Sequence, residues 1–366
     1  MIIFILLAVI FLTYSNGAND NFKGVATLWG SGTLNYRSAL SIATIATLAG
    51  SLCSYYFAEA LLSNFSGKGL IPDHIIQSED FVLSVALAAG GTIFFATRFG
   101  FPISTTHSLI GALVGAGLIS VGAVNQESLF KTFILPLFLS PFVAVLLCNV
   151  LYRFLHFTRK AADITEESCM CIGEEWAPVD VSAQDTNLVA IPRLKASVGS
   201  VKDCNVQYVG SFLGINLHPL LNNLHYASAA VVSFARGLND TPKLVSLLLI
   251  TQLFNISVYI SILAIVMAMG GLLNAKKVAT TMSQKLSSFN HGQGFTANII
   301  TGFLVIFASK FGLPVSTTHV SVGSIYGIGL ANNSANHKEI LKISLSWILT
   351  LPTAGILSAF IFYSIS

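Results

Sequence analysis

Charge is scarce in this sequence. Only 10% of its 366 residues are Asp, Glu, Lys or Arg, against about 25% in an ordinary soluble domain. The formal net charge is only +3, and no run of basic residues interleaved with aromatic ones indicates a nucleic-acid face. These shortages exclude an ordinary water-exposed surface and a nucleic-acid partner.

Cysteine is also sparse. Cys53 and Cys148 lie in apolar segments, whereas Cys169, Cys171 and Cys204 lie in one long polar stretch. Such an odd, scattered set does not predict a disulfide framework. The Cys-Met-Cys spacing with one distant cysteine is a weak pattern for a metal site, because it lacks a clear fourth ligand.

Apolar residues are abundant, at 54% of the chain. They recur in segments near the ~20 residues that span a bilayer. The first run has no basic leader and no small-residue cleavage site, so we expect a membrane helix there rather than a signal peptide. The expected fold is an all-α polytopic membrane protein in the lipid bilayer. Its expected segments are 1–16, 38–62, 81–97, 103–122, 130–156, 224–236, 244–272, 295–309, 313–330 and 341–364.

The sequence contains an internal repeat. Residues 99–118 read FGFPISTTHSLIGALVGAGL and residues 311–330 read FGLPVSTTHVSVGSIYGIGL, identical at 11 of 20 positions without a gap. A second pair precedes it: residues 17–23 read GANDNFK and residues 237–243 read GLNDTPK. The motifs keep the same order in both copies, which indicates duplication.

The two copies are expected to have opposite orientations. Each contains five apolar segments, an odd number, so the second copy enters the membrane from the opposite side and forms an inverted-topology repeat with broken or re-entrant helices at the motifs. We predict a first membrane repeat at 1–157, a polar linker at 158–223 and a second membrane repeat at 224–366.

Basic residues in the short connections predict the orientation. After inversion of the second half, those of both halves gather on the side of the central linker. This places the linker in the cytoplasm and both termini outside, in a cell (inner or plasma) membrane. The basic residues are Arg37, Arg98, Arg153, Arg159, Lys160, Lys276, Lys277, Lys285, Lys338 and Lys342.

The Asn-Asp pairs are the first candidate site. A carboxylate within a membrane span costs ~2.5 to 3.5 kcal/mol unless it is paired or hydrated, so a duplicated one indicates function. Carboxylate and amide oxygens suit a small hard cation. We expect sodium at Asn19, Asp20, Asn239 and Asp240, with Gly17 and its counterpart in the second half permitting a helix break.

The PxSTTH motifs are the second candidate site. Pro102 and Pro314 fix the chain as it enters a helix, and helix N-termini bind anions through free N–H groups and the helix dipole. Two facing N-termini would make a neutral anion site without an arginine. The hydroxyls that would add donors belong to Ser104, Thr105, Thr106, Ser316, Thr317 and Thr318.

His107 and His319 close the two PxSTTH motifs. Each could carry a coupling proton, or could orient the hydroxyls or bond a backbone carbonyl. The glycines that follow resemble helix-packing faces. They are Gly111, Gly115, Gly117, Gly323, Gly327 and Gly329.

The two Asn-Asp motifs and the two PxSTTH copies resemble the duplicated signature of the inorganic phosphate transporter (PiT) family. The resemblance covers essentially the whole membrane part. It implies a symporter of inorganic phosphate, usually driven by sodium, that works by alternating access, needs no further cofactor and forms a homodimer.

Carried onto this sequence, the resemblance assigns phosphate binding to the six Ser and Thr residues of the PxSTTH motifs. Asp20 and Asp240, with the neighbouring asparagines, are shared between anion and cation. The stretch NHGQGFTAN at 290–298 also resembles the family and adds Gln293 and Asn298. The second motif has Thr241 where the first has Asn21, so the two cation sites are expected to differ.

Several alternatives remain open at this stage. The family includes sulfate transporters and proton-coupled members. Protonated phosphate can donate a hydrogen bond to Asp20 or Asp240, whereas sulfate only accepts, which favours phosphate. An anion channel and an intramembrane aspartyl protease are remote alternatives. The protease would leave the repeated STTH motif unexplained, so no enzyme activity is expected.

Overall fold

The structure is a computed structural model that describes residues 1–57, 59–165, 168–179, 189–200 and 213–366. Its contacts define two units. The first contains Met1–Tyr152 and His225–Ser366, and the second contains Arg153–Leu224. The predicted boundaries at 157/158 and 223/224 stay predictions.

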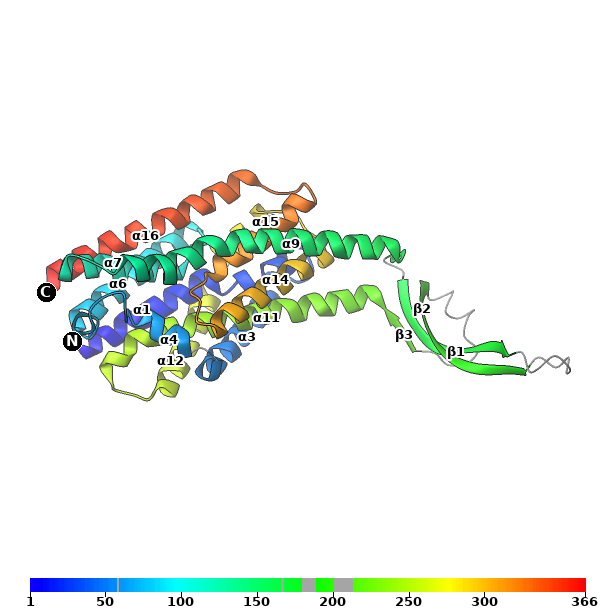
Figure 1. The fold of residues 1–366 in the computed structure, drawn as a ribbon, viewed down its shortest axis with the longest axis horizontal. Helices are drawn as coiled ribbons and strands as arrows, with labels where there is room; N and C mark the ends of the chain where they lie inside the picture. The colour runs from blue at the N-terminus through cyan, green and yellow to red at the C-terminus, as the bar shows by residue number, and fades with distance from the viewer. Residues whose placement is uncertain (58, 166–167, 180–188, 201–212) are drawn as a thin grey trace. The chain divides into compact units, whose positions relative to one another are not determined.

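The first unit is helical (Figure 1). Among the described residues, ten helices of 15 or more residues lie where the apolar segments were expected, five in each half. The first five are α1 (Ile2–Asp20), α3 (Tyr36–Phe57), α6 (Glu79–Phe99), α7 (Thr105–Val121) and α9 (Leu135–Ala161). The second five are α11 (Leu217–Val245), α12 (Ile256–Asn274), α14 (His291–Lys310), α15 (Thr317–Ala331) and α16 (His337–Ile365).

Short helical pieces connect these helices. They are α2 (Ala26–Gly30), α4 (Glu59–Phe65), α5 (Asp73–Ile76), α8 (Gln126–Ser128) and α13 (Lys276–Thr280), the 3₁₀ turns Lys23–Val25 and Ser246–Thr251, and the π-turns Leu129–Ile134 and Thr281–Lys285. Within the described ranges, seven helical spans are long and apolar enough to cross a membrane. The expected all-α polytopic membrane fold is therefore confirmed, while the opposite orientation of the halves stays a prediction.

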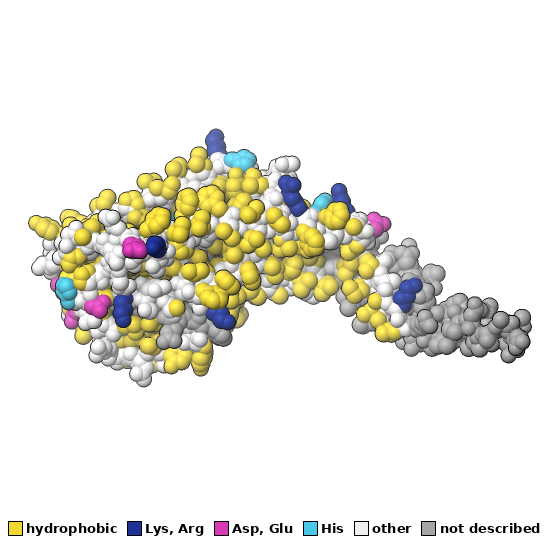
Figure 2. Space-filling view, viewed as in Figure 1, with side chains coloured by type: hydrophobic (Ala, Val, Ile, Leu, Met, Phe, Trp, Pro, Cys, Tyr) yellow, Lys and Arg dark blue, Asp and Glu magenta, His cyan; other side chains and the backbone are white. Residues whose placement is uncertain are grey.

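The outer surface of the helical unit is apolar. Hydrophobic side chains cover most of the face seen in Figure 2, with few charged ones between them. On α9, Phe138, Phe142 and Leu146 are each more than half exposed. Ile348 and Ile356 of α16 are exposed in the same way. Such a surface is compatible with lipid rather than water.

Glycines bring helices of opposite halves together. A Cβ on Gly115 of α7 would collide with the carbonyl of Gly355 in α16. In the other half, a Cβ on Gly327 of α15 would lie 2.6 Å from the carbonyl oxygen of Val145 in α9. The predicted packing role of these glycines is confirmed, and each half packs its PxSTTH helix on the last helix of the other half.

The helix breaks expected at Gly17 and Gly237 are not there. The first lies within α1 and the second within α11, and both helices continue past them. A Cβ on Gly17 would collide with the carbonyl of Met267, and one on Gly237 with that of Thr47. These glycines permit close helix crossing, and the regular helices end later, at Asp20 and Val245.

The second unit contains an antiparallel sheet that the sequence did not predict. Its strands are β1 (Ser168–Val179), β2 (Val189–Ser200) and β3 (Leu213–Asn216), in the order β2-β1-β3. Cys169 is free and Cys171 is disulfide-bonded. Cys204 lies outside the described residues.

Candidate functional site

The Asn-Asp motifs and the PxSTTH motifs of both halves meet in the interior of the helical unit. Asp20 is the last residue of α1, and Asp240 lies in α11. Their exposed fractions are 1% and 2%. The helices α7 and α15 begin beside them, at Thr105 and Thr317. The structure therefore brings all four motifs together in one buried site.

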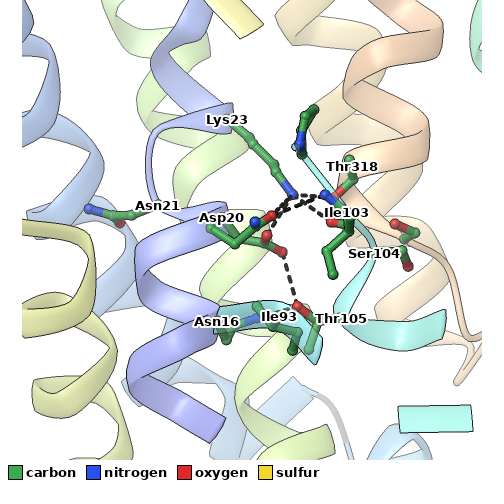
Figure 3. A network of polar contacts seen from close by, with 12 residues as sticks. Asn16, Asp20, Asn21, Lys23, Ile93, Ile103, Ser104, Thr105 and Thr318 are labelled. Carbon is green, nitrogen blue, oxygen red and sulfur yellow. Dashed lines mark hydrogen bonds and ion pairs between the residues drawn. The ribbon is translucent and has the colours of Figure 1, made fainter. Parts of the chain in front are cut away.

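Lys23 is the centre of the polar contacts in the first half (Figure 3). Its Nζ lies 2.5 Å from Oδ1 of Asp20 and 2.9 Å from Oδ1 of Asn19. It also donates to the backbone oxygen of Ile103, at 2.8 Å, and to Oγ1 of Thr318, at 2.5 Å. The lysine thus joins the Asn-Asp motif of its own half to the STTH motif of the other.

Lys243 makes the reciprocal contacts. Its Nζ lies 3.3 Å from Oδ1 of Asp240, 3.2 Å from the backbone oxygen of Val315 and 2.9 Å from Oγ1 of Thr106. The lysine is completely buried. Each half therefore sends a lysine to the second threonine of the opposite STTH motif.

Asn16 and Arg236 connect the two aspartates. Nδ2 of Asn16 lies 2.8 Å from Oγ1 of Thr105 and 3.2 Å from Oδ2 of Asp240. The Arg236 guanidinium donates to Oδ1 of Asn16, at 2.6 Å, and to Oδ1 of Asn21, at 3.1 Å. Its Nε is 3.6 Å from Oδ2 of Asp240. The candidate Asn21 therefore contacts the site through Arg236.

The expectation of a neutral anion site without an arginine is wrong. The site contains the cations of Lys23, Lys243 and Arg236 beside the carboxylates of Asp20 and Asp240. Arg236 gave a signal in the sequence. It lies in an apolar segment three positions before Asn239, and a charged residue within a membrane span is costly and indicates a partner. The sequence analysis assigned no role in the site to Lys23, Lys243 or Arg236.

The two asparagines hold the loops that precede the STTH helices. Nδ2 of Asn19 donates to Oγ1 of Thr97, at 2.9 Å, and to the backbone oxygen of Phe101, at 3.0 Å. Asn239 accepts a hydrogen bond from Oγ of Ser309 at 3.2 Å. Because Thr97 and Ser309 occupy equivalent positions of the repeat, both asparagines position their own PxSTTH loop.

Ser104 and Ser316 cap the helices that follow them. Oγ of Ser104 accepts a hydrogen bond from the backbone N–H of His107 at 3.1 Å, and Oγ of Ser316 accepts one from that of His319 at 3.3 Å. The predicted helix starts after Pro102 and Pro314 are thus confirmed. The capping bond fixes the first turn of each helix.

The threonine hydroxyls cross between the halves. Oγ1 of Thr106 donates to the backbone oxygen of Val315 at 3.3 Å, and Oγ1 of Thr318 donates to that of Ile103 at 2.8 Å. Oγ1 of Thr105 is 3.3 Å from Oδ2 of Asp20. Thr317, equivalent to Thr105, is buried at the start of α15.

The two histidines lie against each other rather than against the carboxylates. The ring centroids of His107 and His319 are 4.6 Å apart. Nδ1 of His319 is 3.2 Å from the backbone oxygen of Leu137, and its ring lies 4.0 Å from that of Trp347. This geometry agrees with a histidine that bonds a backbone carbonyl.

Gln293 and Asn298 have partners elsewhere in the helical unit. The Gln293 side chain caps α14 together with Asn290 and donates to the hydroxyl of Tyr152 at 3.0 Å. Oδ1 of Asn298 accepts a hydrogen bond from Thr27 at 3.0 Å. These contacts give both residues a structural role at some remove from the lysine–aspartate network.

A cavity of about 610 Å³ lies next to the 3₁₀ turn that follows Lys243 and α11. Its lining includes Ser66, Lys68 and Ser246. Oγ of Ser246 donates to the backbone oxygen of Lys243, and the Phe65 ring lies 5.4 Å from the Lys243 ammonium. Ser246 therefore connects the wall of this cavity to the backbone of the buried Lys243.

Comparisons with known proteins agree with one another. A model of the phosphate transporter family matches residues 16–358. A candidate phosphate permease of Pyrococcus horikoshii is 27% identical over 96% of this chain and 94% of its own length. An inorganic phosphate transporter of Arabidopsis thaliana chloroplasts is 25% identical over 95% of this chain and 69% of its own. A solved sodium-dependent phosphate transporter superposes with a TM-score of 0.77 at 21% identity, covering 100% of this chain and 98% of that one.

Proposed function

The chain belongs to the phosphate transporter family, and we propose that it carries inorganic phosphate across a cell membrane by symport with sodium in an alternating-access cycle. The family and the relatives are transporters and permeases. The expectation of a phosphate transporter rather than an enzyme is thereby confirmed. Sodium coupling and the access cycle are the parts that we propose.

The observation that carries the proposal is the meeting of two STTH helix starts with two buried lysine–aspartate pairs. A phosphate there would receive hydrogen bonds from first-turn N–H groups and from hydroxyls of both halves. Lys23 and Lys243 would neutralise its charge. The proposed phosphate ligands are Ser104, Thr105, Thr106, Ser316, Thr317 and Thr318, with Asp20 and Asp240 accepting from the protonated anion.

Sodium is proposed at the oxygens around the two aspartates. Asp20 with Asn19, and Asp240 with Asn239, supply the carboxylate and amide oxygens that a hard cation prefers. The solved relative is named as sodium-dependent, a property of that protein. We extend sodium dependence to this chain because both of its halves supply a carboxylate oxygen and an amide oxygen.

The closed position of the site supports the proposed alternating access. The lysines and aspartates of the network are buried, and none of them lines the cavity at Ser66, Lys68 and Ser246. Phosphate binding and release therefore require a movement that opens the site. In inverted-repeat transporters this movement is a rocking of one repeat against the other around a central site.

The membrane orientation and the homodimer also remain proposals. Basic connections favour a cytoplasmic central segment in a plasma or inner membrane, with both termini outside. The disulfide at Cys171 is typical of an oxidising compartment and favours the opposite side. Protease accessibility of the central segment in intact cells and in inverted vesicles decides between them, and crosslinking in membranes tests the dimer.

Uptake of radiolabelled phosphate into proteoliposomes tests the function. We expect uptake that is driven by an inward sodium gradient, absent with potassium and unaffected by excess sulfate. Uptake abolished by sulfate would make this a sulfate carrier, because the aspartates would then be covered by cations. Flux that no cation gradient drives would indicate a channel.

A proton-coupled phosphate symporter is the second candidate. One observation favours it: the ammonium of Lys23 already binds the oxygens of Asn19 and Asp20 that sodium would need. Uptake driven by a pH gradient alone, without sodium, would select this candidate and leave the phosphate assignment in place.

A further inference from the structure

The two buried lysines lie among the oxygens where the proposed sodium–phosphate symport, on which the following inference rests, needs its cations. We propose that Lys23 and Lys243 are tethered cations that occupy the two sodium sites when no substrate is bound. Phosphate draws their ammonium groups onto itself and so opens the sites for sodium. The lysines then make sodium binding depend on phosphate.

The oxygens around Lys23 form a cation shell. Its Nζ has four oxygens within 2.9 Å: a carboxylate, an amide, a hydroxyl and a backbone carbonyl. An ammonium group has only three N–H donors. Four converging oxygens of these hard types fit a spherical cation better than an ammonium, and they come from α1, the loop before α7 and the start of α15.

The shell around Lys243 is looser and contains no amide oxygen. Asp240, Val315 and Thr106 supply a carboxylate, a carbonyl and a hydroxyl at 2.9 to 3.3 Å. Arg236 shares the carboxylate, with its Nε 3.6 Å from Asp240. The oxygens around Lys243 therefore hold its ammonium group less tightly than those around Lys23 do.

Each lysine also touches the proposed phosphate site. Thr318 and Thr106, which bind the two ammonium groups, belong to the STTH motifs. The lysine side chain is a flexible four-carbon stem with a compact charge. A short movement of Nζ therefore transfers the ammonium from the carboxylate to an anion held at the two helix starts.

Charge explains why sodium has to wait for phosphate. With each side chain in its usual charge state, three cations (Lys23, Lys243 and Arg236) face two carboxylates (Asp20 and Asp240), so the buried site has a net charge of 3 − 2 = +1. Sodium entering alone would raise the positive charge of this buried site, which is strongly unfavourable. A phosphate dianion offsets one added sodium.

Sodium binding to the purified protein tests the proposal. Radiolabelled sodium is measured by scintillation proximity with and without inorganic phosphate, for the wild type, Lys23→Gln, Lys243→Gln and the exposed control Lys131→Gln. We expect the wild type and the control to bind sodium only with phosphate. Each buried-lysine variant should bind it without phosphate, at least about tenfold more tightly than the wild type does.

Three outcomes would overturn the proposal. One is phosphate-independent sodium binding by the wild type, which needs no variant to fold. Another is unchanged phosphate dependence in both folded variants. The third is phosphate transport without sodium by the wild type, combined with sodium-dependent transport by Lys23→Gln. In that case the lysine would occupy the sodium site permanently. A different result would contradict the proposed function itself: the wild type would take up no phosphate under any ion gradient.

Discussion

Asn16 and Arg236 occupy equivalent positions of the two repeats, three residues before Asn19 and Asn239, and are hydrogen-bonded to each other at 2.6 Å. A contact between equivalent residues places this pair where the two halves meet. Two arginines there would repel each other, so an arginine in one copy and an asparagine in the other satisfy the contact. The asymmetry gives Asp240 a cationic neighbour in addition to its lysine.

Replacing Arg236 should destabilise the fold more than any surface arginine does. Arg236→Met leaves Asp240 and Asn16 buried without this partner, and breaking such a pair costs about 3–5 kcal/mol. Arg236→Lys keeps the charge and should cost less. Thermal unfolding in detergent measures both, with the exposed Arg98→Met as control, which is expected within about 0.5 kcal/mol of the wild type.

Asp20→Asn and Asp240→Asn should each abolish sodium-driven phosphate uptake while the fold stays intact. The amide has the shape of the carboxylate but lacks its charge, so it neither balances lysine nor binds sodium. Proteoliposome uptake measures the loss, and size-exclusion chromatography monitors the fold. Asp80→Asn, at the start of α6, is the matched control. Normal uptake by both Asp20→Asn and Asp240→Asn would contradict the proposed mechanism.

Ser104→Ala and Ser316→Ala should weaken phosphate affinity and also reduce stability. Each serine caps its helix, and loss of a cap costs about 1 kcal/mol. Ser78→Ala removes the equivalent cap of α6, outside the site. The phosphate concentration at half-maximal uptake should rise in the first two variants only. An equal rise of this concentration in Ser78→Ala would mean that the effect comes from the loss of a helix cap and not from phosphate binding.

Gly115→Ala should destabilise the helical unit, because its new methyl group collides with the backbone of Gly355 where α7 crosses α16. Overpacking of this kind costs about 1–3 kcal/mol. Gly91→Ala, in the interior of α6, meets only the Leu357 side chain at 3.6 Å. It should raise the melting temperature, since alanine favours a helix by up to about 1 kcal/mol. Equal melting temperatures would contradict the packing role.

His107→Gln should leave sodium-driven uptake measurable. The imidazole faces His319 rather than Asp20 or Asp240, so it lies outside the proposed sodium shells. Uptake is compared under sodium and pH gradients. Complete loss of transport in a folded protein would instead assign proton transfer to this histidine.

Local patterns in the sequence were sufficient for the helical part of the fold. Apolar length predicts the membrane helices, and the proline and serine at the start of each STTH motif predict where α7 and α15 begin. Duplication of two motifs, the Asn-Asp motif and the PxSTTH motif, indicates the family and a shared site. Each of these features depends on neighbouring residues, so it can be recognised without knowing the fold.

Only the tertiary structure decided which residues meet. Lys23 reaches Thr318 across 295 positions of the chain, and Arg236 reaches Asn16 across 220. No periodicity encodes such pairs, because they depend on how the two halves pack. The same packing gives Gly17 and Gly237 a role in helix crossing, and it turns an expected neutral site into one where three cations face two carboxylates, since buried charges are stable only beside their partners.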